Sequence, residues 1–112
     1  MTIPKYILPE KQGNYKFMVF KMVDDSYVRF HKLSIEDIPI GLPLPQHPEI
    51  VDAFAKEIGI YVKTMGGGLC LFRPEMKEAL FHGESTILGK FDKMSLENAI
   101  AGLEKEYEIT IH

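Results

Sequence analysis

The sequence predicts an α/β fold of the α+β type, with a single mixed β-sheet of about six strands flanked by two helices. The chain has 112 residues, of which 46% are hydrophobic and 26% charged, as in one globular domain with a sizeable core. Apolar residues recur at helical spacing in two segments, and short runs rich in β-branched and aromatic residues lie around them. We therefore expect a single domain over residues 1–112.

The expected strands are separated by turn-forming residues. Residues 1–13 contain two prolines and scattered charges, and are expected to form an N-terminal arm before the sheet. Asp24-Asp25 predicts a turn between the first two strands. The triplet Gly66-Gly67-Gly68 predicts a break between two strands, although glycines here also allow a bulge or a close approach to the backbone. The predicted strands are 15–23, 27–32, 60–65, 69–72, 79–81 and 108–112.

Two helices are expected, and a proline-rich segment leads into the first. Residues 35–46 contain three prolines and one glycine, which favour a restrained loop. Pro48 suits the first helical position, so His47 falls at the cap and Gly59 ends the helix. Its apolar face consists of Ile50, Val51, Phe54 and Ile58. Ser95 is expected to cap the second helix, with an apolar face of Leu96, Ala99, Ile100 and Leu103.

Charge and cysteine content narrow the classes of partner. The net charge is −3, and Arg29 and Arg73 are the two arginines, so there is no basic stripe for nucleic acid. A single cysteine, Cys70, excludes an intrachain disulfide and a zinc site of the Cys-pair type, which fits the cytoplasm. It lies in an apolar run and is expected to be a small buried hydrophobe. Neither a signal peptide nor a membrane span is expected, because no long apolar run occurs.

His47 is the leading candidate for a catalytic residue. An imidazole over the positive end of a helix is shifted towards its neutral form, which can accept a proton or attack phosphorus. The alternative is a histidine that merely caps the helix. His31, His82 and His112 have no metal-ligand spacing with His47 and are expected to be surface or strand residues. We therefore expect neither a metal nor a cofactor.

Two further segments are candidates for binding an anion. Lys16 stands at the start of a strand covered on both sides, where it either meets a phosphoryl group or simply extends its ammonium to solvent. Gly83-Glu84-Ser85-Thr86-Ile87-Leu88-Gly89-Lys90 differs from a nucleotide-binding P-loop in spacing and in the residue after the lysine. Its consecutive amides and its hydroxyls still allow an anion nest.

The ordered set of these motifs resembles the small phosphohistidine phosphatases, known as the Janus family. That set is Tyr15-Lys16-Phe17, His47-Pro48-Glu49, Gly66-Gly67-Gly68, Gly83-Glu84-Ser85 and Glu106-Tyr107-Glu108-Ile109, collinear over residues 15–112. The resemblance implies a mixed sheet flanked by two helices and metal-independent hydrolysis of a phosphorus–nitrogen bond on protein histidine, with lysine as an alternative. It implies that His47 is catalytic and that Lys16 and Ser85, with the amides through Thr86 and Ile87, bind phosphate.

Other functions stay open beside this one. Leu69 follows the glycine triplet where the family has an arginine, and Gln46 precedes His47 where an aromatic residue is expected; both favour a catalytically silent module that binds an anion or a phosphoprotein. An interface domain is a third alternative, if Tyr27, Arg29 and His31 form an exposed face. The expected partner is a phosphorylated protein or a small phosphoramidate, and the expected state is a monomer or weak dimer.

Overall fold

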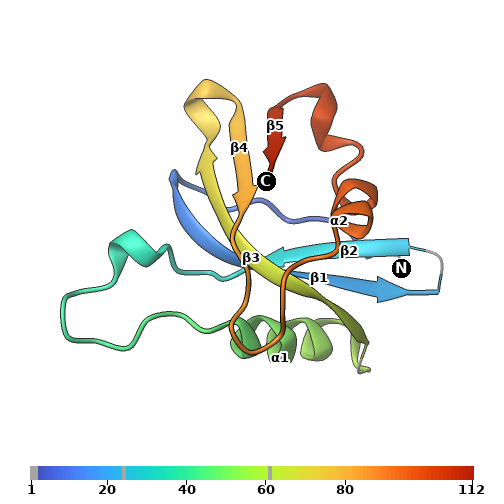
Figure 1. The fold of residues 1–112 in the computed structure, drawn as a ribbon, viewed down its shortest axis with the longest axis horizontal. Coiled ribbons are helices and arrows are strands. Elements are labelled where there is room, and N and C mark those ends of the chain that lie inside the picture. The colour runs from blue at the N-terminus through green and yellow to red at the C-terminus, as the bar shows by residue number, and fades with distance from the viewer. Residues whose placement is uncertain (1–2, 24, 61) are drawn as a thin grey trace.

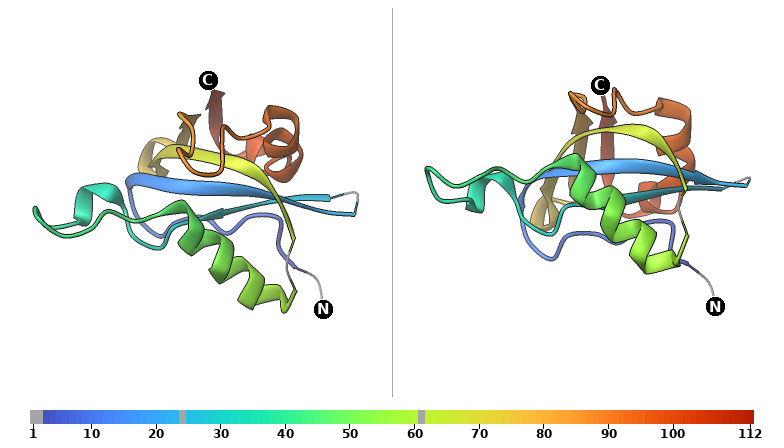
Figure 2. Two further views of the ribbon diagram at one scale, coloured as in Figure 1. Left: turned by 60° about the horizontal axis from the view of Figure 1, so that its bottom comes forward. Right: turned by 90° about the horizontal axis from the view of Figure 1, so that it is seen from below.

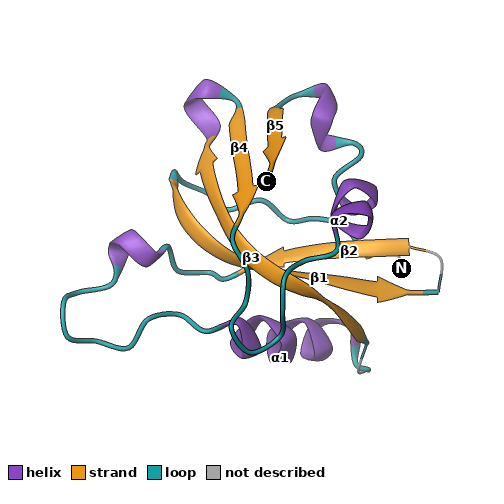
Figure 3. Cartoon of the chain, viewed as in Figure 1, coloured by secondary structure: helices purple, strands orange, loops and turns teal. Residues whose placement is uncertain are grey.

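The computed structural model describes residues 3–23, 25–60 and 62–112, which form one five-stranded sheet and two α-helices (Figures 1 and 3). Asp24 of the predicted turn and Tyr61 of the predicted strand 60–65 lie outside the described residues. The elements are β1 (Gly13–Met22), β2 (Asp25–Phe30), η1 (Ile35–Asp37), α1 (His47–Ile58), β3 (Lys63–Arg73), η2 (Pro74–Met76), β4 (Glu78–His82), α2 (Lys93–Ala99), η3 (Leu103–Lys105) and β5 (Glu108–Ile111).

The sheet is mixed, as predicted, with the strand order β2-β1-β3-β4-β5. β1 pairs antiparallel with β2 and with β3, β3 pairs antiparallel with β4, and β4 pairs parallel with β5. This order makes β1, β3 and β4 interior strands and leaves β2 and β5 as the two edges. The site described below is built on the interior strands, which pairing holds on both sides.

The prediction of about six strands was wrong because the glycine triplet does not interrupt its strand. β3 runs through all three glycines as one strand of 11 residues. Met18 of β1 pairs with Gly67, whereas Phe20 pairs with Thr64, so β3 holds one extra residue over this interval. Gly66 has φ +80°, a conformation that glycine adopts without a steric penalty. A β-bulge at Gly66 therefore bends the strand without ending it.

The two helices cover opposite faces of the sheet (Figure 2). On one face, Phe17, Phe72 and Phe81 pack with Leu96 and Ile100 of the α2 region in the larger core cluster. On the other face, a smaller cluster joins α1 to β1 and consists of Met18, Phe20, Ile50 and Phe54. Alternate residues of β1 thus enter two separate cores, as expected for a strand that is apolar on both faces. No helix in the described ranges has the length and apolar character to cross a membrane.

Helix α1 begins one residue earlier than predicted. Gln46 is the N-cap, and His47 is already helical. The cause is Glu49, whose Oε1 accepts a hydrogen bond of 2.7 Å from the backbone N–H of Gln46. The helix ends at Gly59, as predicted, with φ +79° and its N–H bonded to the carbonyl of Ala55.

Helix α2 also has a different cap from the one predicted. Asp92 is the N-cap, and its Oδ2 accepts hydrogen bonds from the backbone N–H of Ser95 at 3.0 Å and from the Ser95 hydroxyl at 2.7 Å. A carboxylate accepts both bonds at once, so it is the stronger cap. Ser95 lies inside the helix and is buried.

The face formed by Tyr27, Arg29 and His31 is not exposed, contrary to one of the alternatives above. Arg29 and His31 are buried, and the Arg29 guanidinium lies 4.8 Å from the Phe54 ring centroid on α1. Arg29 also donates two hydrogen bonds to the carboxylate of Glu57, at 3.0 and 2.9 Å. Helix α1 of the same chain thus packs against this face.

Candidate active site

The predicted site residues meet around one pocket of about 210 Å³. The start of α1, strands β1 and β3, and the loop after β4 all contribute to it. The lining residues are Lys16, Ile35, Gln46, His47, Pro48, Leu69, Glu84, Ser85, Thr86 and Ile87. Thus the structure brings together Lys16, His47, Ser85, Thr86 and Ile87, which are far apart in the sequence. Gly83 and the glycine triplet do not line the pocket. Their roles are in the backbone that supports it, as described below.

His47 is fixed by a hydrogen bond to the central strand. Its Nε2 lies 2.9 Å from the carbonyl oxygen of Gly68, and the side chain is buried with the residue 6% exposed. A carbonyl accepts only, so Nε2 carries the proton, and in the neutral ring the lone pair is on Nδ1. Nδ1 has no hydrogen-bond partner among the described residues. It is also not among the described atoms that are both unpartnered and fully buried. It is therefore positioned to act as a base or a nucleophile.

The pKa of His47 is lowered, which favours the neutral ring. Burial is the largest cause, because it penalises the charged imidazolium. The hydrogen bond to the Gly68 carbonyl acts in the opposite direction, while electrostatic repulsion from the side chains of Lys16 and His31 lowers the pKa of His47 further. The sequence led us to expect a lowered pKa from the helix terminus; in the structure, burial is the main cause.

The glycine triplet provides the space in which His47 and the loop after β4 approach β3. A Cβ atom on Gly67 would lie 2.8 Å from Cδ2 of His47 and 2.5 Å from the carbonyl oxygen of Phe17. A Cβ on Gly68 would lie 2.5 Å from the carbonyl oxygen of His82, and one on Gly66 would overlap the carbonyl of Lys90. The triplet thus allows the His47 ring and the loop after β4 to approach the backbone of β3 closely, which is one of the two possibilities that its glycines left open in the sequence.

Lys16 projects from β1 beside His47 and has no counter-ion in the described part of the chain. It is half-buried, and it pairs across the sheet with Leu69, which in turn pairs with His82. Paired residues on adjacent strands point to the same face, so Lys16, Leu69 and His82 form one row. The ammonium of Lys16 is available to an anion in the pocket.

The loop after β4 folds around Ser85. The Ser85 hydroxyl accepts a hydrogen bond of 3.0 Å from the N–H of Leu88, and the backbone groups of Ser85 and Gly89 bond to each other in both directions. Gly83, with φ +72°, allows the chain to turn as it leaves β4. The N–H groups of Thr86 and Ile87 have no partner among the described residues. These two amides, more than the engaged Ser85 hydroxyl, can bind an anion.

A backbone hydrogen bond holds this loop against the sheet. The N–H of Gly67 donates to the carbonyl of Gly89 at 3.0 Å, and Gly67 forms an isolated parallel bridge with Lys90. The residue that contacts the His47 ring is therefore also the one that anchors the loop. The two halves of the site are linked through Gly67.

Glu84 is a lining residue that sequence reasoning missed. Its side chain is exposed, and it lies between Gly83 and Ser85 at the edge of the pocket. A carboxylate here opposes the binding of an anion and partly offsets the charge of Lys16. The sequence indicated only that Glu84 belongs to the loop.

An exposed apolar loop stands beside the pocket. Residues 38–46 project from the body of the protein at the left of Figure 1, and Ile40, Leu42 and Leu44 are exposed on them. Ile35 before this loop and Gln46 at its end both line the pocket. The prolines at 39, 43 and 45 are expected to limit the conformations of this loop.

The remaining metal-ligating side chains do not converge in the described part of the chain. No three His, Cys, Asp or Glu residues there form a group that could hold a metal ion. Cys70 is fully buried, as predicted, and burial raises the pKa of its thiol. His31 was expected at the surface or in a strand; it is buried just after β2, with Nε2 3.5 Å from Oε1 of Glu49.

Comparisons with known proteins assign no family to this chain. No family model and no curated protein matches it. The argument for function therefore depends on the geometry of Lys16, His47 and the loop after β4.

Proposed function

We propose that this protein is a metal-independent phosphohistidine phosphatase, which hydrolyses the phosphorus–nitrogen bond of a phosphorylated histidine, with phospholysine as an alternative substrate. The observation that carries the proposal is the meeting of a neutral histidine, an unpaired lysine and unpaired backbone amides in one small pocket. A phosphoryl group needs a cation and N–H donors for its oxygens, and its hydrolysis needs a base or nucleophile near phosphorus. The pocket offers each of these.

His47 has two chemically balanced roles in such a reaction. Its Nδ1 either removes a proton from a water molecule that attacks phosphorus, or attacks phosphorus itself to form a phosphorylated enzyme that water then hydrolyses. In both cases the products are inorganic phosphate and the free side chain, whose nitrogen takes up a proton. Lys16 and the amides of Thr86 and Ile87 balance the charge on the phosphoryl oxygens.

The resemblance to the Janus family supports the same proposal. We further propose that the chain has the fold of that family. The family implies a mixed sheet flanked by two helices, and this chain has a mixed sheet with one helix on each face. Three of the five motifs, those that contain Lys16, His47 and Ser85, contribute residues to one pocket. Leu69 stands where the family has an arginine, so Lys16 is the principal cation of the proposed site.

A protein is the favoured substrate over a small phosphoramidate. The pocket of about 210 Å³ is small, so it would hold only the phosphorylated side chain. The neighbouring residues of a protein substrate would contact the surface around the mouth of the pocket. The loop 38–46 presents exposed Ile40, Leu42 and Leu44 beside that mouth. Exposed apolar side chains on a proline-restrained loop are suited to contact a protein surface.

A silent binding module of the same fold is the second candidate, and Leu69 and Glu84 favour it. Leu69 lies in the row with Lys16 and His82 at the position where the family has an arginine, so this row has one positive charge fewer than in the family. Glu84 adds a negative charge at the edge of the pocket. Both features weaken charge stabilisation of a transition state.

Phosphate release from a phosphohistidine peptide separates the two candidates. Wild-type protein is expected to release phosphate faster than the peptide alone does, and His47→Ala is expected to remove the excess. A silent module would bind the peptide, but neither protein would release phosphate faster than the peptide alone does. Circular dichroism of His47→Ala checks that the fold is retained.

A further inference from the structure

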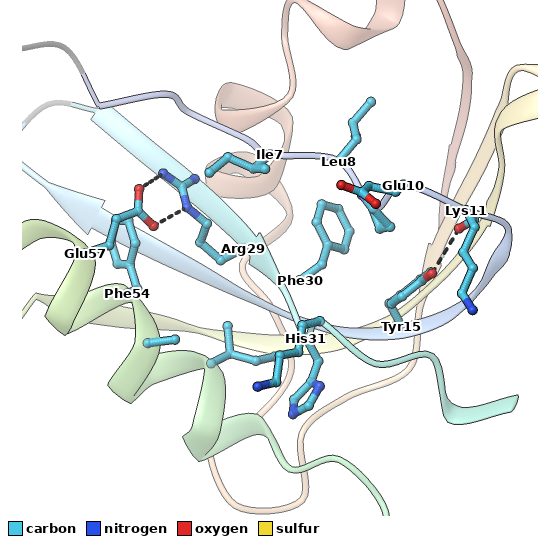
Figure 4. A pocket seen from close by; sticks show the side chains of 14 residues that line it. Ile7, Leu8, Glu10, Lys11, Tyr15, Arg29, Phe30, His31, Phe54 and Glu57 are labelled. Atoms are coloured by element: carbon cyan, nitrogen blue, oxygen red, sulfur yellow. Dashed lines mark hydrogen bonds and ion pairs between the residues drawn. The ribbon is translucent and has the colours of Figure 1, made fainter. Parts of the chain in front are cut away.

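A second and larger cavity, of about 690 Å³, lies along the outer edge of β2 (Figure 4). One wall is the N-terminal arm from Ile7 to Lys11, and the other is the flank of α1 at Ile50, Ala53, Phe54 and Glu57. Between these walls lie Arg29, Phe30, His31 and Lys32, and Tyr15 lies next to Lys11, whose carbonyl accepts a hydrogen bond of 2.9 Å from the Tyr15 hydroxyl. The volume falls within the ~300–1,000 Å³ typical of ligand pockets. We name this cavity the β2 groove.

The β2 groove exposes backbone groups that have no strand to pair with. The N–H of Val28 points outward and donates to the carbonyl of Lys5 on the arm at 2.9 Å, whereas the N–H of His31 points inward and donates to Lys16 at 2.8 Å. Successive residues of a strand direct their N–H and C=O groups to opposite sides. The groups of Phe30 therefore point outward, like those of Val28. They have no partner among the described residues.

The arm already shows how a chain pairs with this edge. Tyr6 forms a parallel bridge with Val28, but the arm makes no further bridge with β2 in the described residues. The cavity opens beside Phe30, next to where this pairing stops. An edge with unpaired N–H and C=O groups is a template for a strand from another chain.

One end of the groove is closed by a polar clamp. Arg29 donates a hydrogen bond of 2.7 Å from Nη2 to the carbonyl of Pro4 on the arm, while Nε and Nη2 donate to the Glu57 carboxylate on α1 and Nη1 donates to the carbonyl of Val28. The clamp joins the two walls, and its charges are paired. Beyond the clamp the lining includes the apolar side chains of Ile7, Leu8 and Ala53, together with the charged side chains of Glu10, Lys11 and Lys32.

We propose that the β2 groove binds an extended polypeptide segment of a partner protein, which adds to the edge of β2 at Phe30 and places apolar side chains between the arm and α1. The unpaired N–H and C=O groups of Phe30 call for a ligand with backbone amides. The charges along the groove nearly balance, because Arg29 is paired with Glu57, Lys11 is paired with Asp37, and Glu10 is opposite in sign to Lys32. They therefore do not favour a small ion as the ligand. This binding is independent of the phosphatase site and does not require His47.

A selection of random linear heptapeptides displayed on phage tests the proposal. The immobilised proteins are wild type, Ala53→Trp and Met94→Trp. Ala53 is exposed on the groove wall, so the indole fills the groove, whereas Met94 lies 80% exposed on α2, over the other face of the sheet. Enrichment is expected on wild type and Met94→Trp and at least tenfold less on Ala53→Trp. Ile7→Arg, on the opposite wall, replaces Ala53→Trp if that variant does not fold.

The selected peptides, made synthetically, then identify the mode of binding. Methylation of single backbone nitrogens should weaken binding at least tenfold at alternate positions and leave the positions between them unchanged. Hydrogen exchange of the Phe30 amide should slow at least tenfold in the complex, and His47→Ala should bind equally well. The proposal is overturned if wild type enriches no peptide more strongly than Ala53→Trp does. It is also overturned if methylation at alternate backbone nitrogens does not change the affinity, or if the exchange rate of the Phe30 amide is the same with and without the peptide.

Discussion

The Nε2 atom of His47 lies 2.9 Å from the carbonyl oxygen of Gly68, so the first turn of α1 is bonded directly to the central strand β3. This bond sets the ring orientation and the tautomer, since a carbonyl can only accept. It depends on the absence of a side chain at Gly67, where a Cβ would lie 2.8 Å from the imidazole. The position and the protonation of the proposed base therefore depend on two neighbouring glycines.

Gly67→Ala should impair both the fold and the site. The new Cβ would lie 2.5 Å from the Phe17 carbonyl oxygen, so backbone or helix must shift. We expect the free energy of unfolding to fall by about 1–3 kcal/mol, the usual cost of overpacking, and turnover to fall with it. Urea unfolding and phosphate release measure the two effects.

Gly102→Ala is the matched control for this substitution. Gly102 has φ −74°, and the nearest atom to its added Cβ is the Tyr6 hydroxyl oxygen at 3.6 Å, an ordinary contact. We expect a change in the free energy of unfolding within about 1 kcal/mol, stabilising in sign. Equal stability of the Gly67 and Gly102 variants would contradict the close packing assigned to Gly67.

The Arg29–Glu57 ion pair should make stability depend on pH in acid. Hydrogen bonds from Arg29 are the largest cause of the lowered pKa of Glu57. A group with a lowered folded-state pKa stabilises the fold above its unfolded value, here 4.5, and this stabilisation is lost as the pH falls through the folded-state pKa. Wild type should therefore be more stable than Glu57→Gln at pH 7, and the difference should shrink in acid.

At pH 7 we expect this difference to be about 1–2 kcal/mol, below the ~3–5 kcal/mol of fully buried pairs. The reason for the smaller value is that the Glu57 side chain is 35% exposed. Urea unfolding of both proteins at pH 7 and near pH 3 tests the sign. A difference that grows towards acid would contradict the assigned pairing.

Lys16→Met should weaken phosphate binding while leaving the fold intact. Methionine keeps most of the apolar stem of the half-buried lysine but removes the ammonium, so a charge-assisted contact on the order of 1.5–3 kcal/mol is lost. Titration calorimetry with inorganic phosphate measures the affinity. Lys21→Met, an exposed lysine of the same strand, is the control. Equal affinity of the two variants would remove Lys16 from the proposed site.

Glu84→Gln should strengthen phosphate binding. The exposed carboxylate at the edge of the pocket repels a phosphate, so its removal should lower the dissociation constant roughly two- to fivefold at low salt. The gain should diminish as salt is added, because mobile ions screen exposed charges. Weaker binding would indicate that Glu84 takes part in binding the ligand.

The sequence allowed prediction of the elements whose signals are local. Pro48 and Gly59 bracket α1 to within a residue, and the alternation from Tyr15 onwards identified the strand shared by the two cores. The resemblance to the Janus family implied that Lys16, His47 and the loop at Ser85 belong to one site, and the fold shows that they line a single pocket.

The parts that were missed depend on contacts between distant residues. Gly66 bulges within a strand where the backbone of Lys90 leaves no room for a side chain, and Lys90 is 24 positions away in the sequence (90 minus 66). Arg29 and His31 have polar side chains and alternate with apolar ones, so the sequence indicated an exposed face, yet α1 packs over them. The β2 groove has no signature in the sequence, because it exists only where the arm leaves the edge of β2.

The decisive measurement is kcat/KM for a phosphohistidine peptide as a function of pH, in EDTA and after subtraction of the uncatalysed rate, for wild type and His47→Ala. Burial lowers the pKa of His47 below its ordinary value of 6.5, and only the neutral ring can act as base or nucleophile. Wild-type activity should therefore rise through one ionisation below pH 6.5 and stay level into mild alkali, while His47→Ala should be folded and inactive. Turnover retained in folded His47→Ala, or activity that falls as the pH rises through this range, would contradict the proposed role of His47.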